Sequence, residues 1–382
     1  MNSINISKEI KKILILGVGA AQYDAISYCK NQGYDVYAIS YKKEGRGIEL
    51  ADYFSTIDIK DKKEVLEYAK TTEVDIVYSV GSDIAMPTVS YVSQNIGLEY
   101  FVKEETAMLL QNKDKLRKFI KDNKLGYIPY LVSNSLDELS TWKDFPAIIK
   151  PVDSQGQRGI FEVNNTSELL HYFSKSLSFS YTKKVIVEHY IDGPEISANA
   201  FVVNGSLIYN FITDRFVVED VPGGVVRGHR LPSSINAQTR QNAEELIAKT
   251  IKALGILNGP VYFQMKYNEK GVFLIEVTPR LDGCHIWRLI KEKYGVDLLA
   301  LFFKLLDPDK KVSAPLKYNY ESILEGALDI EFMLQPPNSV FHKESPVKNT
   351  LYEEYYYKEG EVVRPINWHA EKTGYRIIKV ES

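Results

Sequence analysis

The sequence predicts an α/β protein with an open parallel sheet in about its first 100 residues, an α+β segment after it, and a small strand-rich C-terminal part. Residues 11–40 have the pattern of a strand, a glycine turn, a helix and a second strand, and residues 61–83 have the pattern of a further helix and strand. These patterns are typical of βαβ units in a parallel sheet. From about residue 145, short strands come in pairs with helices between them. This change of pattern predicts the second, α+β, region.

Periodicity and turn residues locate the individual elements. Parallel strands are expected at 13–16, 36–39 and 75–80, and helices at 62–70, 112–126, 166–175 and 237–254. Strand pairs are expected at 147–151 with 159–163, 185–188 with 196–203, 196–203 with 206–212, and 261–267 with 272–277. Asn204-Gly205 predicts a tight hairpin turn in the third pair. The tail from about residue 313 contains KEGEVV and KTGYRIIKV and predicts a small cap of strands.

Composition limits the class of protein. The 382 residues are 45% hydrophobic and 25% charged, which predicts a sizeable core in two or three domains. The net charge of −3 carries no basic excess, so we expect no nucleic-acid partner. No apolar run approaches the ~20 residues of a membrane span, and the first apolar run reads as a strand rather than a signal sequence. Two cysteines, Cys29 and Cys284, are too few for a disulfide framework, which favours a cytoplasmic location.

A glycine turn follows the first expected strand. Gly17 and Gly19 suggest the dinucleotide-binding fingerprint, but Gln22 stands where its third glycine would be. The second expected strand ends at Ser40 rather than at an acidic residue. A lone pair of glycines is a weak signal. A nicotinamide-dependent oxidoreductase is therefore a remote alternative, and a structural turn is favoured.

Lys150 ends an apolar strand and is followed by the loop DSQGQRG. An unpaired ammonium is costly to bury, and a phosphate is a natural partner for such a point charge. Gly156 and Gly159 would let the loop backbone approach an anion closely. The lysine precedes the glycines, so this is not a GxxxxGK[ST] loop. An ordinary hairpin turn is the other interpretation.

Carboxylates follow two later strands. Glu188 and Glu195 flank a Gly-Pro turn in VEHYIDGPE, an extended crossover whose backbone could meet an adenine edge. Glu276 ends another apolar strand, and Arg280 comes four residues later. A carboxylate beside a phosphate requires a cation between them, and Mg²⁺ suits that place because it takes oxygen ligands and bridges phosphates.

Together, Lys115 in KDK, Lys150 before its glycine loop, VEHYIDGPE and IEVTPR resemble the ATP-grasp superfamily in order and spacing. The resemblance extends over essentially the whole chain, and PRLDGCHIWRLI is most similar to the carboxylate–amine ligase branch, especially amino-acid ligases and carbamoyl-phosphate-synthase-like proteins. It implies a pre-ATP-grasp domain, two ATP-grasp subdomains and a C-terminal cap. We expect their boundaries at 1–100, 101–184 (including a linker helix), 185–312 and 313–382.

The resemblance also implies roles for single residues. ATP phosphates would contact Lys115 and Lys150, under a mobile lid at 153–159 that includes Ser154, Gln155, Gly156 and Gly159. Glu188 and the backbone through Ile191 would meet adenine, and Glu195 the ribose. Glu276 would bridge Mg²⁺ ions, and Arg280 would hold the carboxylate substrate. Two positions depart from the family pattern, because Thr278 replaces the usual Asn and Gln264 is the best candidate for a ligand that is usually acidic. Both would supply neutral oxygens to the metal site.

The segment VVRGHRLPSS offers further candidates for the acidic substrate, namely Arg227, His229 and Arg230. The simpler interpretation is a solvated surface loop. Cys284 shows no readable partner for a nucleophile, and packing suits it better.

The function implied is an ATP-dependent ligase that joins a small carboxylate to an amine through an acylphosphate, with ATP and Mg²⁺ as cofactors. An amino acid is the first expectation for the acid, and a cell-surface sugar acid the second. A homodimer is left open. An ATP-binding protein without ligase activity is the main alternative, because of Gln264 and Thr278.

Overall fold

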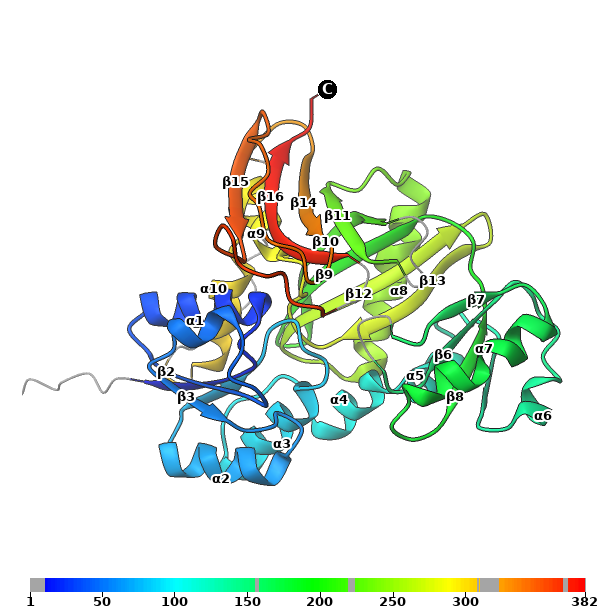
Figure 1. The fold of residues 1–382 in the computed structure, drawn as a ribbon, viewed down its shortest axis with the longest axis horizontal. Coiled ribbons are helices and arrows are strands. Elements are labelled where there is room, and N and C mark those ends of the chain that lie inside the picture. The colour runs from blue at the N-terminus through cyan, green and yellow to red at the C-terminus, as the bar shows by residue number, and fades with distance from the viewer. Residues whose placement is uncertain are drawn as a thin grey trace, which may run out of the picture.

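The computed structural model describes residues 11–154, 158–218, 224–307, 309, 323–366 and 370–381. Its N-terminal part is a parallel sheet of order β3-β2-β1-β4. Its strands are β1 (Lys12–Leu16), β2 (Asp35–Ser40), β3 (Tyr53–Thr56) and β4 (Ile76–Tyr78). Helix α1 (Ala20–Asn31) lies on one side, and α2 (Lys62–Thr72) and α3 (Met86–Ile96) lie on the other (Figure 1). The predicted parallel sheet is confirmed.

The glycine turn after β1 is filled by a side chain of the protein itself. Gly17 has a φ of +99°, and a Cβ there would lie 3.2 Å from the Gln22 side chain. The Gln22 amide accepts a hydrogen bond from the Gly19 N–H (3.0 Å) and donates to the carbonyl of Val80. The side chain that replaces the third glycine thus ties α1 to the end of β4, which supports the structural interpretation of this turn.

A second sheet, of order β5-β8-β6-β7, is antiparallel throughout. It comprises β5 (Tyr130–Ser133), β6 (Ala147–Pro151), β7 (Phe161–Val163) and β8 (Val185–His189), with α6 (Leu136–Leu139) and α7 (Thr166–Ser178). The pairing of 147–151 with 159–163 is confirmed as β6 with β7. The predicted pairing of 185–188 with 196–203 is wrong, because β8 pairs with β5 and β6 instead. Both candidate partners are apolar strands, so the hydrophobic pattern could not choose between them.

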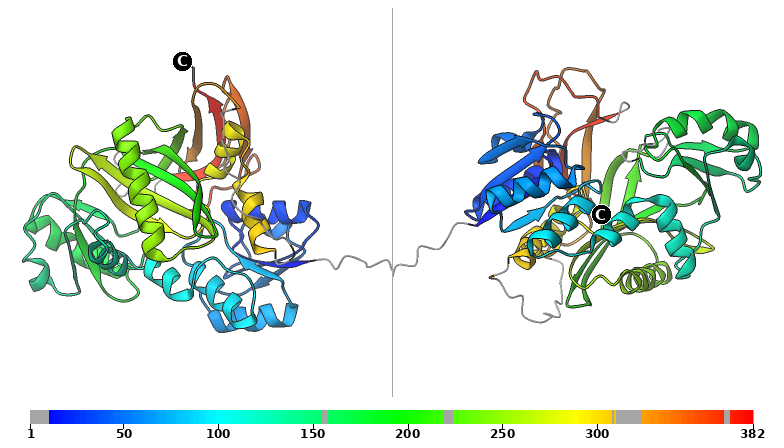
Figure 2. Two further views of the ribbon diagram at one scale, coloured as in Figure 1. Left: turned by 180° about the vertical axis from the view of Figure 1, so that it is seen from behind. Right: turned by 90° about the horizontal axis from the view of Figure 1, so that it is seen from below.

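The third sheet has eight strands in the order β13-β12-β9-β10-β11-β14-β16-β15. They are β9 (Glu195–Val203), β10 (Ser206–Val217), β11 (Val226–Leu231), β12 (Gly259–Asn268), β13 (Gly271–Thr278), β14 (Leu328–Gln335), β15 (Thr350–Tyr355) and β16 (Glu371–Lys379). Both predicted hairpins are confirmed, and helix α8 (Ala237–Leu254) packs on β12 and β13. The strands of the expected cap continue this sheet, because β14 pairs with the free edge of β11. Figure 2 shows them rising beside the N-terminal part.

Four helices connect these sheets: α4 (Glu104–Gln111), α5 (Lys113–Asp122), α9 (Ile286–Tyr294) and α10 (Leu298–Leu306). Helix α5 ends at Asp122, four residues before the expected stop at Gly126. Helix α10 returns to the N-terminal sheet, where Phe302 packs on Tyr78 with ring centroids 4.1 Å apart. One hydrophobic core therefore runs through the first and third sheets, while the second sheet has its own.

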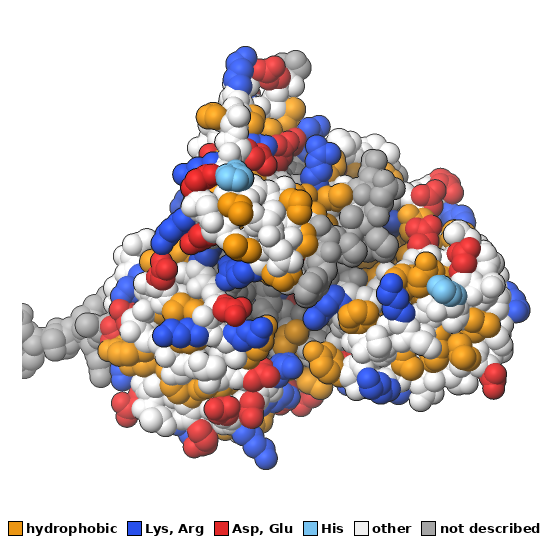
Figure 3. Space-filling view, in the orientation of Figure 1, with side chains coloured by type: hydrophobic (Ala, Val, Ile, Leu, Met, Phe, Trp, Pro, Cys, Tyr) orange, Lys and Arg blue, Asp and Glu red, His pale blue; other side chains and the backbone are white. Residues whose placement is uncertain are grey.

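Charge is mixed on one face of the molecule. Acidic and basic side chains alternate on the face drawn in Figure 3, without a broad basic area there. None of the described helices combines the length and the apolar character that a membrane span requires.

Candidate functional site

A buried ion network joins the second sheet to helix α5. The Glu188 carboxylate on β8 accepts hydrogen bonds from the Lys150 ammonium on β6 (2.7 Å) and from Arg117 Nε and Nη2 on α5 (2.9 and 3.1 Å). These three side chains are between 2% and 7% exposed. Arg117 also donates to the carbonyls of Leu274 and Ile275 on β13. The network therefore fixes Lys150 where the second and third sheets meet.

Burial and charge shift the pKa values of this network in opposite directions. Burial alone would raise the pKa of Glu188, but Arg117 and Lys150 outweigh it and lower the pKa to about 2. Burial lowers the pKa of Lys150 to about 8, although Glu188 opposes this effect. Glu188 is consequently ionised at neutral pH, and Lys150 is close to its titration range. An added anion beside Lys150 would favour its protonated form.

The structure places Lys113, rather than Lys115, at this site. Burial lowers the pKa of Lys113, and the opposing charges around it include Glu276 and Glu188. Its ammonium donates to the carbonyl of Ser154 (2.6 Å). Lys115 is exposed, because two residues further along an α-helix a side chain points about 200° away. The overlooked signal was the i, i+4 spacing of Lys113 and the buried Arg117.

The loop after Lys150 is described only in part, and Gln155 and Gly156 lie outside the described residues. Its base is fixed by Asp153, whose carboxylate accepts bonds from the Ser180 hydroxyl (2.9 Å) and the Thr182 N–H (2.8 Å). Ser154 is buried. Gly159 has a φ of +76°, and a Cβ there would lie 2.8 Å from the Phe179 ring. A glycine is therefore required where the chain leaves the loop.

The expected metal ligands lie side by side on the β12–β13 hairpin. Glu276 is directly opposite Gln264 in the strand register. The Gln264 amide nitrogen donates to Glu195 (3.0 Å), which leaves its carbonyl oxygen to accept or coordinate. The Thr278 hydroxyl is buried and has no hydrogen-bond partner among the described residues. Within the described part of the chain, no group of three His, Cys, Asp or Glu side chains could hold a metal. The three oxygens fit Mg²⁺ that keeps water and phosphate ligands.

The residues expected at the nucleoside are partly engaged with protein groups. The Glu188 carboxylate is committed to the ion network, so the expectation that it meets adenine is wrong for its side chain. It is held between Arg117 on α5 and Lys150 on β6, which together neutralise it. Glu195 accepts hydrogen bonds from Arg215 and Gln264. The carbonyl of Ile191 accepts a bond from the Lys266 ammonium (3.0 Å).

Arg280 connects the third sheet to the N-terminal part. Its guanidinium forms a two-point ion pair with Asp83, with Nε–Oδ1 and Nη2–Oδ2 distances of 2.7 and 2.8 Å. Burial would lower the pKa of Arg280, but Asp83 outweighs it and the pKa is raised. Gly81 and Gly283 allow the two loops to touch, since a Cβ on Gly81 would lie 2.9 Å from the Gly283 Cα. The partner of Arg280 is thus a distant residue that no local pattern could indicate.

The segment 225–234 is largely a strand, so the surface-loop interpretation is wrong. His229 on β11 is completely buried, because β10 and β14 pair on both sides of it. Burial lowers its pKa well below the ordinary value, as do the nearby Arg215 and Lys372. Arg230 instead forms a two-point pair with Asp329 on β14, with both distances 2.8 Å. Arg227 is exposed.

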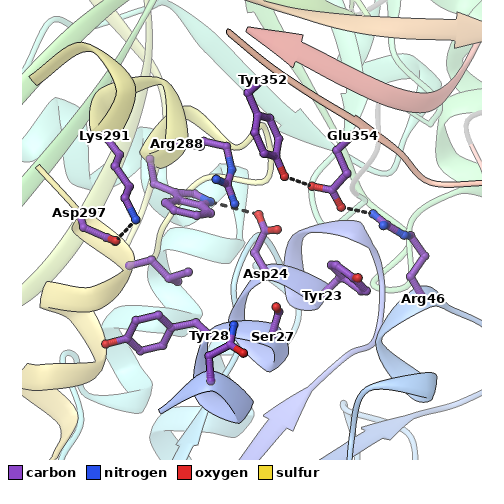
Figure 4. A pocket seen from close by; sticks show the side chains of 13 residues that line it. Tyr23, Asp24, Ser27, Tyr28, Arg46, Arg288, Lys291, Asp297, Tyr352 and Glu354 are labelled. Carbon is purple, nitrogen blue, oxygen red and sulfur yellow. Dashed lines mark hydrogen bonds and ion pairs between the residues drawn. The ribbon is translucent and has the colours of Figure 1, made fainter. Parts of the chain in front are cut away.

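A separate cavity of about 420 Å³ lies between α1, α9 and β15 (Figure 4). Two ion pairs line it, Arg46 with Glu354 and Lys291 with Asp297. Arg46 donates to Glu354 (2.6 Å) and stacks over the Tyr23 ring at 4.0 Å. Asp24 on α1 accepts a bond from Trp287 Nε1 on α9 (3.2 Å). The cavity walls therefore form a polar interface between the N-terminal part and the C-terminal strands.

Comparisons with known proteins identify a domain and a shared fold. Residues 143–287 match the ATP-grasp domain. The chain is 23% identical over 339 residues to the carbamoyl phosphate synthase large chain of Pseudothermotoga lettingae, a match that covers 83% of this chain and 30% of that relative. The chain thus spans about a third of the relative's length.

Two solved structures have the same fold over nearly the whole chain. The L-amino acid ligase of Bacillus licheniformis superposes with a TM-score of 0.79 at 16% identity, covering 98% of this chain and 95% of that one. The biotin carboxylase domain of the Hydrogenobacter thermophilus 2-oxoglutarate carboxylase gives 0.78 at 16% identity, covering 97% and 86%. That structure contains ADP with magnesium and bicarbonate, which is consistent with ATP and Mg²⁺ as cofactors. The chain therefore contains an ATP-grasp domain, at residues 143–287, within a fold that it shares with these enzymes over almost its full length.

Proposed function

We propose that the protein is an ATP-dependent carboxylate–amine ligase that forms an amide through an acylphosphate and releases ADP and phosphate. The observation that carries the proposal is a set of three cations, of which Lys150 and Arg280 are buried and Lys113 is half-buried, in the neighbourhood of Glu276. Lys113, Lys150 and Arg280 come from three separate parts of the fold. Glu276 lies within electrostatic reach of Lys113 and Arg280, and Lys113 within reach of Lys150. Cations around one carboxylate suit a polyphosphate with a divalent cation.

The reaction needs positioning and charge neutralisation more than a protein nucleophile. A carboxylate oxygen of the acid attacks the γ-phosphorus of ATP, and ADP leaves. The amine nitrogen then attacks the carbonyl carbon of the acylphosphate, phosphate leaves and a proton is lost. Lys113 and Lys150 would hold the phosphates. Arg280, oriented by its ion pair with Asp83, would hold the reacting carboxyl through the guanidinium N–H groups that this pair leaves over.

The remaining expected residues take supporting roles in this proposal. The backbone through Ile191 would meet adenine, and Glu195 would lie at the ribose. Glu188 would orient Lys150 rather than touch the base. Glu276, with oxygens of Gln264 and Thr278, would hold Mg²⁺, which neutralises phosphate charge when it is bound.

The second candidate is an ATP-binding protein without ligase activity. The neutral side chains at Gln264 and Thr278 favour it, because they leave Glu276 as the one carboxylate among the three expected ligands. A nicotinamide-dependent oxidoreductase has less support, since Gln22 fills the glycine turn that a pyrophosphate would need.

Phosphate release separates these candidates. The protein is incubated with ATP and Mg²⁺ and a matrix of carboxylic acids and amines that includes the amino acids. We expect release that depends on both an acid and an amine. ATP binding without any such release would favour the binding protein, and NADH binding in place of ATP binding would favour the oxidoreductase.

A further inference from the structure

A cluster of polar side chains lies beside the proposed reaction centre and has no role in the function proposed so far. We call Arg215, His229, Asp282 and Lys372 the inner cluster. They come from β10, β11, the loop after β13, and β16. The guanidinium of Arg280 lies 5.7 Å from the centroid of the Tyr262 ring. Arg215 and Asp282 are electrostatically coupled to the same tyrosine. Tyr262 is therefore a neighbour of both the cluster and Arg280.

Three buried polar atoms of the inner cluster have no hydrogen-bond partner among the described residues. They are Arg215 Nε, His229 Nε2 and Asp282 Oδ2. Their residues are 8%, 0% and 2% exposed, respectively. A buried polar group without a hydrogen-bond partner destabilises the folded protein. Three such groups in one cluster, contributed by separate elements, indicate a site that a polar ligand completes.

The two cations of the cluster differ in their protein partners, because Arg215 is hydrogen-bonded to a carboxylate and no described carboxylate is hydrogen-bonded to Lys372. Arg215 donates through Nη1 to Glu195, and that contact leaves Nε free. The contacts of the Lys372 ammonium are the Cys284 sulfur at 3.6 Å and the face of the Phe332 ring at 3.4 Å. Neither of these neutralises it as a carboxylate would. Two donors with positive charge and a neutral imidazole suit a carboxylate group.

Asp282 differs from the cations of the cluster because it can accept a hydrogen bond from a ligand. Its Oδ1 accepts the N–H groups of Cys284 (2.7 Å) and Ile286 (3.2 Å), which fixes the carboxyl group and leaves Oδ2 unpaired. The charges of both Arg280 and Lys372 act on it. It is therefore near both Arg280 and Lys372 and offers an acceptor to a donor group.

We propose that the inner cluster binds the amine substrate and that this substrate is an α-amino acid. Its carboxylate lies between Arg215 Nε and the Lys372 ammonium. Its amino group donates to Asp282 Oδ2, which turns the nitrogen toward the carboxyl group held at Arg280. A simple anion would leave Asp282 facing a like charge, and a simple amine would leave Arg215 Nε and the Lys372 ammonium without an acceptor among the described residues. This inference rests on the proposed function, because it assigns that ligase's amine.

Binding measurements with substrate analogues test the assignment. Calorimetry is carried out with Mg²⁺ and a non-hydrolysable ATP analogue present, and each of the twenty common L-amino acids is titrated. Any that binds is compared with its amide, which lacks the carboxylate charge, and with its 2-hydroxy acid, which lacks the amino group. We expect at least one amino acid to bind, and both analogues to bind at least tenfold more weakly.

Variants then assign the two ends of the ligand. Lys372→Met keeps the stem over Phe332 and should weaken amino-acid binding at least tenfold, with nucleotide affinity within twofold of wild type. Lys372→Arg should retain binding. Lys379→Met, an exposed lysine of the same strand, should change neither affinity. Asp282→Asn should abolish the preference for the amino acid over its hydroxy acid, a readout that a purely structural role would not move.

The outcomes separate this inference from the function on which it rests. If the nucleotide analogue does not bind, the proposed function itself is wrong. If the nucleotide binds but no amino acid does, or if the amides bind as tightly as the acids, the assignment of the inner cluster is wrong and the ligase proposal stands. Equal loss of amino-acid binding in Lys372→Met and Lys379→Met would also overturn the assignment.

Discussion

The ion network around Glu188 allows a quantitative prediction. In Glu188→Gln, Arg117 and Lys150 lose the one carboxylate that accepts from both of them. Removing one partner from a buried ion pair costs about 3–5 kcal/mol. The pKa gives a similar figure, because it falls from an ordinary 4.5 to about 2, and each pKa unit corresponds to about 1.4 kcal/mol. We therefore expect Glu188→Gln to lower the free energy of unfolding by roughly 3 kcal/mol at pH 7.

The loss of folding stability at acid pH provides a second test of the same ion network. A carboxylate with a depressed pKa contributes stability above pH 4.5, and that stability is lost as the pH falls from 4.5 toward 2. Linkage gives a loss of about 2 kcal/mol between pH 7 and pH 3 from this group alone. Wild type should lose this amount in addition to whatever Glu188→Gln loses over the same range, since the variant lacks the group. Denaturant unfolding followed by circular dichroism at both pH values measures it.

The matched control is Asp329→Asn, which removes the two-point partner of Arg230. The side chain of Arg230 is 36% exposed, and exposed pairs are typically worth ~1 kcal/mol or less. If Glu188→Gln costs no more than this control at pH 7, or if it keeps the full acid sensitivity of wild type, the account of the network is refuted.

The remaining predictions concern the proposed reaction. Lys113→Met should weaken binding of ATP analogues at least tenfold by calorimetry, and Lys115→Met should not; the reverse ranking would contradict the site. Arg280→Ala should leave nucleotide affinity intact but slow phosphate release by on the order of 10²-fold. Arg280→Lys should not restore the rate of phosphate release. Turnover near the wild-type rate in Arg280→Ala would show that Arg280 is only a structural partner of the N-terminal part. Gln264→Glu combined with Thr278→Asn should lower the Mg²⁺ concentration needed for half-maximal nucleotide binding, and an unchanged Mg²⁺ dependence would remove these positions from the metal site.

Local patterns determined part of the secondary structure. Helix α8 lies at the predicted residues 237–254, since a long amphipathic pattern with a capping Asn and a closing Gly leaves little choice. The Asn204-Gly205 hairpin was equally determined, because both residues take the positive φ that its tight turn requires. The position of Lys150 at a strand end was likewise readable from its apolar neighbours.

Partners distant in sequence were decided by the tertiary structure. The pairing of β8 with β5 and β6 was hidden because apolar strands of similar length are interchangeable by pattern. The residue at which α5 begins decides which of its side chains face the interior. For this reason Lys113 points inward and Lys115 does not. Burial of the segment around His229 required β14, a strand contributed by the chain about 100 residues later.

The candidate site shows the same division. Residue types and spacing indicated phosphate, metal and carboxylate chemistry, because each depends on the charge and shape of a single side chain. The inner cluster could not be predicted from the sequence, since Arg215 and Lys372 are far apart in the chain and neither belongs to a motif. Hydrogen bonds and charges act over a few ångströms whatever the separation along the chain. The sequence therefore determined which chemical groups the protein has, and the fold decided which of them meet.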